Sequence, residues 1–245
     1  GRLNTLAHIM HQGYANIFAE FTDTEERAIE TEAVGYTVDD VKYHKGAVYN
    51  VPDSNLTITM SPNPSHLEAV NPVVVGMARA AATHSDRGGA PEFDPHKTTQ
   101  VLIHGDAAFP GQGIVAETFN LSRLPGYSVG GTIHIIANTQ LGFTTMPQDG
   151  RSTLYASDLA KGFRVPIVHV NADDPAACIE VARMAIAFST RFEKDFLIDL
   201  IGYRRYGHNE LDQPSFTQPR LYEVVRQHAT VRALWAEQLE KVGLL

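Results

Sequence analysis

Four short apolar runs alternate with helical segments through the centre of the chain, and this alternation limits the fold more than any other feature. The runs cover residues 101–104, 132–137, 167–171 and 196–201. They are short and rich in Val and Ile, as buried strands are, and strands separated by helices form parallel sheets with both faces covered. The sequence therefore predicts an α/β fold with a doubly wound, mainly parallel sheet and helices on both faces.

The segments between and around these runs carry helix, strand and loop signals. We expect helices over residues 113–123, 175–191 and 219–242, a helix or helix pair on either side of Gly13, a strand over 56–60, and a surface loop over 23–40. Ser65 is placed to cap a helix over residues 66–83, and Asp174-Pro175 opens the helix over residues 175–191. We expect one domain over residues 1–245, divided into N-terminal helices and a loop (1–60), the core sheet (61–202) and a C-terminal loop and helix (203–245).

Composition and charge exclude several classes of protein. The formal net charge is −8 and the basic residues are scattered, which argues against a nucleic-acid partner. No apolar stretch is long enough to span a membrane. The single cysteine, Cys178, fits a reducing compartment such as the bacterial cytoplasm or the mitochondrial matrix. Because the chain starts without Met and runs straight into an apolar-periodic segment, we expect a piece of a longer protein.

Oxygen-rich side chains follow two of the predicted strands at the point where each strand ends. Asp106 comes two residues after the first run, and Asn138, Thr139 and Gln140 follow the second. Ligands bind at the carboxyl ends of strands in such sheets, so these groups converge if the two strands are neighbours. One carboxylate with neutral oxygen donors suits Mg²⁺, and a helix that starts near Gly113 would direct free N–H groups at a phosphate.

Two other interpretations of these residues remain open on the sequence alone. Asp106 could simply cap the helix that follows its strand. Alternatively, Gly111-Gln112-Gly113 could open a dinucleotide-binding motif, since residues 111–116 formally match G-x-G-x-x-A. The dinucleotide reading fits poorly, because residues 105–110 separate the strand from the first Gly and no acidic residue closes the second strand.

Several blocks of sequence, in order, are similar to one enzyme family. The blocks are Gly1-Arg2-Leu3-Asn4, Lys42-Tyr43-His44, residues 63–68, residues 103–108, residues 111–113, Glu117-Thr118, residues 138–145, residues 169–175 and residues 203–210. Together they resemble the 2-oxoglutarate dehydrogenase family, the decarboxylating first component of a dehydrogenase complex. The resemblance spans nearly the whole chain and implies the thiamine-diphosphate-binding fold, with thiamine diphosphate and Mg²⁺ as cofactors.

The resemblance also implies roles for individual residues. Asp106, Thr139 and the Leu141 carbonyl would bind Mg²⁺, while Ala107 and Ala108 would meet the diphosphate. Thr139 stands where the family has a second Asn, and its hydroxyl is one bond shorter than an Asn amide oxygen. We therefore expect either weaker direct binding to the metal or a water molecule that fills the gap. A further set, which the resemblance places at substrate or cofactor, comprises His44 (substrate), Ser65 (substrate and cofactor) and Leu67 (cofactor).

By the same resemblance, the intact enzyme decarboxylates 2-oxoglutarate and passes a succinyl group to a lipoyl-bearing acyltransferase component. The family implies a homodimer. Alternatives are a 2-oxoadipate dehydrogenase, a 2-oxoglutarate decarboxylase, or a degenerate, non-catalytic cofactor-binding module. The family's pyrimidine-binding domain is absent from this sequence, so we expect the chain alone to lack dehydrogenase activity.

Overall fold

The computed structural model describes residues 1–19, 21, 41–86, 88–209 and 211–245, which form two compact units, Gly1–Val70 and Asn71–Leu245. Each unit is described by itself. The loop predicted over residues 23–40 lies outside the described residues.

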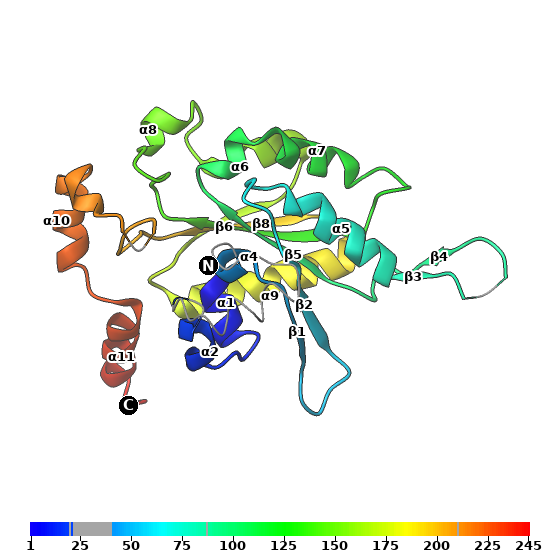
Figure 1. Cartoon of the computed structure of the whole chain (residues 1–245), viewed down its shortest axis with the longest axis horizontal. Coiled ribbons are helices and arrows are strands. Elements are labelled where there is room, and N and C mark those ends of the chain that lie inside the picture. Colours follow the sequence, from blue (N-terminus) through cyan, green and yellow to red (C-terminus); the bar gives the residue numbers. More distant parts are fainter. Residues whose placement is uncertain (20, 22–40, 87, 210) are drawn as a thin grey trace. The chain divides into compact units, whose positions relative to one another are not determined.

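The second unit is built on a four-stranded parallel sheet (Figure 1). Its strands are β5 (Gln100–Gly105), β6 (Thr132–Asn138), β7 (Ile167–Asn171) and β8 (Phe196–Ile201). The spatial order is β5-β6-β8-β7, and all neighbouring strands run parallel. The four predicted strands are therefore confirmed, and the strand ends that carry Asp106 and Asn138 are neighbours.

Helices cover both faces of this sheet, which confirms the doubly wound fold. On one face lie α6 (Ala108–Gly111), α7 (Gly113–Leu121) and the 3₁₀ helix η1 (Ala156–Phe163); on the other lies α9 (Pro175–Phe192) (Figure 1). Successive strand residues point to opposite faces. Leu197 accordingly packs with Phe109 and Phe119 on the first face, whereas Phe196 and Ile198 pack against α9 on the second.

The first unit has its own small core. It contains α1 (Arg2–His8), α2 (Tyr14–Ala19), α4 (Val41–His44) and an antiparallel hairpin of β1 (Ala47–Asn50) and β2 (Thr57–Met60). Leu6, Met10 and Ile17 are buried between these helices and the hairpin. The predicted helix pair around Gly13 and the predicted strand before Ser61 are both confirmed.

The helix predicted over residues 66–83 starts later than expected. It is α5 (Val70–Ala81), and Ser65 does not cap it. Glu68 has a positive φ of 69°, which is incompatible with a right-handed helix and separates Ser65 from α5. The Ser65 hydroxyl lies instead 3.3 Å from Nε2 of His44.

The prediction of a single C-terminal helix over residues 219–242 is wrong. Two helices occupy this segment, α10 (Pro219–Gln227) and α11 (Val231–Lys241). His228 between them is extended, and its Nε2 lies 2.7 Å from Oδ2 of Asp173. Thr230 caps the second helix by accepting a hydrogen bond from the Ala233 amide.

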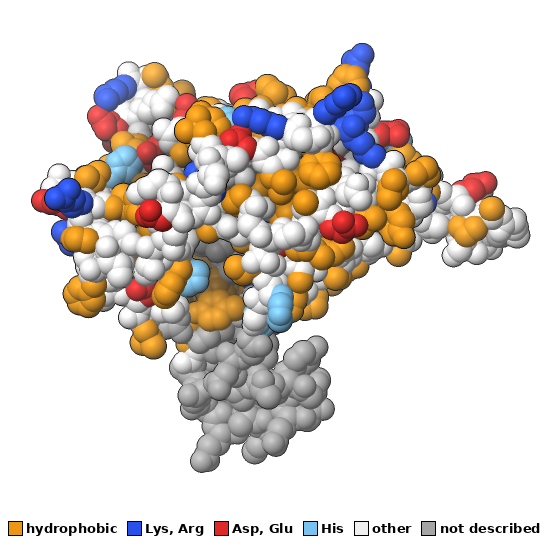
Figure 2. All heavy atoms as spheres, turned by 90° about the horizontal axis from the view of Figure 1, so that it is seen from above, with side chains coloured by type: hydrophobic (Ala, Val, Ile, Leu, Met, Phe, Trp, Pro, Cys, Tyr) orange, Lys and Arg blue, Asp and Glu red, His pale blue; other side chains and the backbone are white. Residues whose placement is uncertain are grey.

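The remaining elements are short. They are the antiparallel pair β3 (Thr83–His84) and β4 (Glu92–Phe93), α8 (Pro147–Gly150) and the 3₁₀ helix η2 (Pro214–Phe216). None of the helices that the structure describes is long and apolar enough to cross a membrane. On the face seen in Figure 2, apolar side chains are interspersed with acidic and basic ones.

Truncating the core on the α7 face should destabilise the chain strongly. Phe119 is 2% exposed, and its ring centroid lies 5.9 Å from that of Phe109 and 5.3 Å from that of Phe163. We expect Phe119→Ala to lower the free energy of unfolding in urea by about 3–5 kcal/mol. Phe216 is 85% exposed, so Phe216→Ala should change the free energy by less than about 0.5 kcal/mol. Equal losses from the two variants would contradict this account of the core.

The Cys178 thiol should react slowly with alkylating agents. Burial raises its pKa, and the Asp174 carboxylate raises the pKa further, so less of the reactive thiolate is present at pH 8. Asp174 caps α9 by accepting a hydrogen bond from the Ala177 amide. Asp174→Asn keeps a capping oxygen but removes the charge, so the pKa of Cys178 should fall and iodoacetamide labelling should accelerate. Glu180→Gln, a neutralised and exposed carboxylate on the same helix, should leave the rate unchanged.

Candidate functional site

Side chains from the ends of β5 and β6 meet at the carboxyl edge of the sheet. In the register of these strands Gly105 lies beside Ala137, so the residues that follow each strand are adjacent. Oδ1 of Asp106 accepts a hydrogen bond from the Thr139 amide at 3.2 Å and lies 3.4 Å from Thr139 Oγ1. Thr139 Oγ1 lies 3.3 Å from the Leu141 carbonyl oxygen. The structure thus gathers three predicted metal-binding oxygens, although their role as ligands stays a prediction.

These distances are compatible with a shared Mg²⁺ ion. Adjacent ligands in an octahedron with bonds of about 2.1 Å are about 3.0 Å apart. The Thr139 hydroxyl oxygen lies only a few tenths of an ångström farther than this from the Asp106 and Leu141 oxygens, at distances too long for strong hydrogen bonds between oxygens. A carboxylate, a hydroxyl and a carbonyl also form the hard, oxygen-only set that Mg²⁺ prefers. The residues present therefore fit the metal.

The two alternative interpretations of this region are wrong. Ala107, not Asp106, precedes α6, and no side chain caps this helix in the described chain. Asp106 is 4% exposed and reaches across to the neighbouring strand end instead. Gly111 and Gly113 lie at the junction of α6 and α7, away from the strand end. In a dinucleotide-binding motif the first glycine would follow the strand directly. The short helix α6 was not predicted from the sequence.

The turn after β6 is held in an uncommon backbone conformation. Gln140 and Phe143 have φ values of 56° and 54°, in the left-handed region that residues with a side chain seldom adopt. Oδ1 of Asn138 accepts a hydrogen bond from the Gln140 amide, and Nε2 of Gln140 donates to the Gly202 carbonyl at 2.8 Å. Such conformations persist only where surrounding contacts fix them. The turn is therefore anchored to the end of β8.

A buried carboxylate on β8 supports the same turn. Asp199 is fully buried; its Oδ1 accepts a hydrogen bond from Nδ2 of Asn138 at 3.0 Å, and its Oδ2 lies 2.7 Å from Nδ1 of His169. A buried carboxylate needs such partners, because removing a charge from water is costly. The contacts connect β7, β8 and β6 to the turn that carries Thr139. His169 is partly exposed on an edge strand, whereas His134 is buried.

Residues far along the chain hold the outer part of the turn. Nη2 of Arg204 donates to the Phe143 carbonyl at 2.6 Å, and Nε2 of Gln218 donates to the Thr144 carbonyl at 2.5 Å. Asp199 and Gln218 were not predicted as site residues, because sequence separations of 61 and 74 residues leave no local signal.

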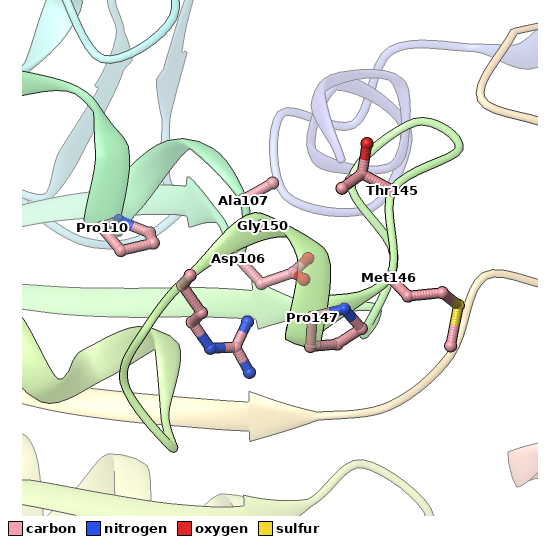
Figure 3. Close-up of a pocket in the computed structure, with 9 residues that line it drawn as sticks. Asp106, Ala107, Pro110, Thr145, Met146, Pro147 and Gly150 are labelled. Carbon is pink, nitrogen blue, oxygen red and sulfur yellow. The ribbon is translucent and has the colours of Figure 1, made fainter.

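A small pocket opens beside the Asp106 carboxylate (Figure 3). Ala107 and Pro110 from the start of α6 face the loop that carries Thr145, Met146 and Pro147 (Figure 3). The cavity volume is about 20 Å³, enough for one water-sized group rather than a whole diphosphate.

Small residues allow the close approach that forms this pocket. A Cβ on Gly142 would lie 2.5 Å from the Cβ of Ala107, so only glycine lets the turn after β6 approach the end of β5. Ala107 lines the pocket as expected for a residue that meets a phosphate. Ala108 opens α6 and is not among the described residues that line it. Residues of α6, rather than the N-terminus of α7 near Gly113, face the pocket.

Other predicted site residues belong to the first unit. His44 and Ser65 are brought within hydrogen-bond distance of each other, at 3.3 Å between Nε2 and Oγ. Leu67 is 63% exposed. In the described parts of the chain, no group of three or more His, Cys, Asp or Glu side chains is arranged to hold a metal ion.

Known proteins are similar in sequence to this chain over its whole length. The family model described as "Dehydrogenase E1 component" matches residues 4–245. The 2-oxoglutarate dehydrogenase E1 component of Bacillus mycoides (strain KBAB4) is 56% identical over 247 residues, which cover 100% of this chain and 26% of the relative. The protein of the same name from Geobacillus sp. (strain WCH70) is 54% identical over 254 residues, covering 100% of this chain and 27% of the relative. The chain thus spans about a quarter of the length of these relatives.

Neutralising Asp199 should loosen the turn after β6. We expect Asp199→Asn to lower the free energy of unfolding by about 1–3 kcal/mol, because donors of Asn138 and His169 then face an amide instead of a carboxylate. Hydrogen exchange at the amides of Thr139 and Gln140 should accelerate, as measured by NMR.

Asp195 provides a matched control for this variant. It is also buried, but it accepts a hydrogen bond from the Thr132 amide, at the opposite end of the same strands. Asp195→Asn should therefore cost similar stability without changing exchange at Thr139 and Gln140. If both variants accelerate exchange there equally, the supporting role of Asp199 is wrong.

Proposed function

Because this chain belongs to the dehydrogenase E1 component family, we propose that it is the diphosphate- and Mg²⁺-binding domain of a thiamine-diphosphate-dependent 2-oxoglutarate dehydrogenase. The observation that carries the proposal is the meeting of Asp106 Oδ1, Thr139 Oγ1 and the Leu141 carbonyl at the ends of two neighbouring parallel strands. In this proposal the whole chain, residues 1–245, serves as one functional domain of the enzyme.

The metal ion would be held by Asp106, Thr139 and Leu141, with water and phosphate oxygens completing its octahedron. Asp106 would supply the only negative charge among these three ligands. Leu141 binds through its backbone, and its side chain is 3% exposed, which fixes the direction of the carbonyl. The small side chains of Ala107 and Ala108 would let the diphosphate approach the backbone.

When bound, thiamine diphosphate supplies the nucleophilic carbon and the electron sink for decarboxylation of a 2-oxoacid. The chain's own residues bind and orient. We assign His44 to the substrate, Ser65 to substrate and cofactor, and Leu67 to the cofactor. The contact between the His44 imidazole and the Ser65 hydroxyl supports this, because each group fixes the other's orientation and both can donate hydrogen bonds to a carboxylate.

The proposal also names partners. The complete enzyme would act on 2-oxoglutarate as a homodimer and pass a succinyl group to a lipoyl-bearing acyltransferase component. Its compartment would be the bacterial cytoplasm or the mitochondrial matrix, where a free thiol such as Cys178 stays reduced. Relatives that act on 2-oxoadipate, or that release the decarboxylated product without a lipoyl partner, are separated from this assignment by assaying the complete enzyme with each 2-oxoacid.

Calorimetric titration with thiamine diphosphate and Mg²⁺ tests the metal site, using the chain alone and with a pyrimidine-binding domain supplied in trans. Asp106→Asn should weaken Mg²⁺-dependent binding by at least about 100-fold, since even outer partners of metal ligands contribute 10- to 100-fold. Thr139→Asn restores the longer amide donor and should strengthen binding by about 10-fold.

Asp149→Asn is the control for charge, because it removes an exposed carboxylate from the nearby helix α8. It should leave binding unchanged. Absence of binding under every condition would instead identify a degenerate module in which Thr139 has replaced an essential ligand. Binding that is insensitive to Asp106→Asn would refute the metal site itself.

A further inference from the structure

Arg151 lines the pocket beside Asp106 and Ala107, and the sequence analysis had not predicted it as a site residue. Its Nε is buried and has no hydrogen-bond partner among the residues that the structure describes. Nη2 donates one long hydrogen bond, of 3.4 Å, to the Leu154 carbonyl. A guanidinium has five N–H donors, so most of its hydrogen-bonding capacity is unused.

The charge of Arg151 is also unmatched within the described residues. No Asp or Glu side chain there forms an ion pair with it, Asp106 included. A buried donor without an acceptor costs about 1–3 kcal/mol, and such groups in folded proteins call for a specific explanation. An anion that enters the pocket would supply both the acceptor and the missing charge.

Hydrogen bonds fix the backbone that carries Arg151. Its amide donates to the Pro147 carbonyl at 3.1 Å, closing α8. The preceding loop is closed by two mutual hydrogen bonds between Gly142 and Thr145, at 2.9 and 2.8 Å. Immobilised donors bind an anion with little further loss of entropy.

The chemistry of the pocket selects one class of anion. A guanidinium binds phosphate through two parallel N–H···O bonds, and the cavity of about 20 Å³ admits an oxygen atom rather than a large group. The Asp106 carboxylate in the same wall would repel an anion unless a divalent cation lay between them. Arg151 and Asp106 together therefore favour a metal-bound phosphate over a simple carboxylate.

We propose that Arg151 binds a phosphate oxygen of the metal-bound diphosphate. This inference rests on the proposed function, because it takes the diphosphate to be that of the cofactor. It adds a positively charged, side-chain ligand to a site otherwise made of the metal ligands and backbone.

Isothermal titration of the chain with inorganic diphosphate and Mg²⁺ tests the inference without any activity readout. Arg151→Gln removes the charge and should weaken diphosphate binding by about 10- to 100-fold, the effect of losing charge-assisted hydrogen bonds. Arg151→Lys keeps the charge and most of the stem but not the paired donors, so its affinity should lie between those of Arg151→Gln and the wild type.

Arg123→Gln is the matched control. Arg123 also donates to a backbone carbonyl, that of Phe163 at 2.8 Å, but it does not line the pocket. Its removal should leave diphosphate affinity unchanged. Thermal unfolding of each variant establishes that it is folded, and Arg151→Lys carries the test if Arg151→Gln does not fold.

The outcomes separate this inference from the proposed function. A wild-type chain that binds magnesium diphosphate, with unchanged affinity in both Arg151 variants, overturns the role of Arg151 alone. A wild-type chain that does not bind magnesium diphosphate overturns the proposed function and the inference together. A parallel titration with succinate tests a carboxylate ligand: loss of succinate binding in Arg151→Gln, with diphosphate binding retained, would assign Arg151 to the substrate and overturn the inference.

Discussion

The buried carboxylate of Asp199 connects most of what is particular to this structure. It lies on a central strand and contacts Asn138 at the end of one neighbouring strand and His169 on the other. A carboxylate without exposure to water must keep such partners, so the three strand ends cannot move independently. Asn138 in turn accepts a hydrogen bond from the Gln140 amide, and this contact ties the turn after β6 to the sheet.

The sequence was sufficient for the architecture because the fold follows from strong, local signals. The strands over residues 167–171 and 196–201 were predicted to the residue, and the cap at Asp174 formed as expected. The errors occurred where tertiary contacts overrode a local preference. The positive φ of Glu68 makes α5 start later than predicted. The segment predicted as one helix over residues 219–242 is interrupted at His228, which contacts Asp173.

The candidate site divides in the same way. Asp106 and Thr139 were identifiable because strand ends in a parallel sheet converge whatever their sequence separation. Arg151, Arg204 and Gln218 were not identifiable, since the position of each relative to the site depends on the path of a loop. Residue type and strand position predicted which side chains meet at this edge of the sheet, and the tertiary structure supplies the contacts that support them.

The two long-range tethers of the turn after β6 also bear on how the protein is made. The carbonyls of Phe143 and Thr144 are held by residues that follow them by 61 and 74 positions. A ribosome synthesises a chain from its N-terminus, and domains complete their folding as the later segments emerge. The oxygen cluster therefore stays without its outer supports until Arg204 and then Gln218 have left the exit tunnel. The turn after β6 reaches its fully supported form only after these later residues have been translated.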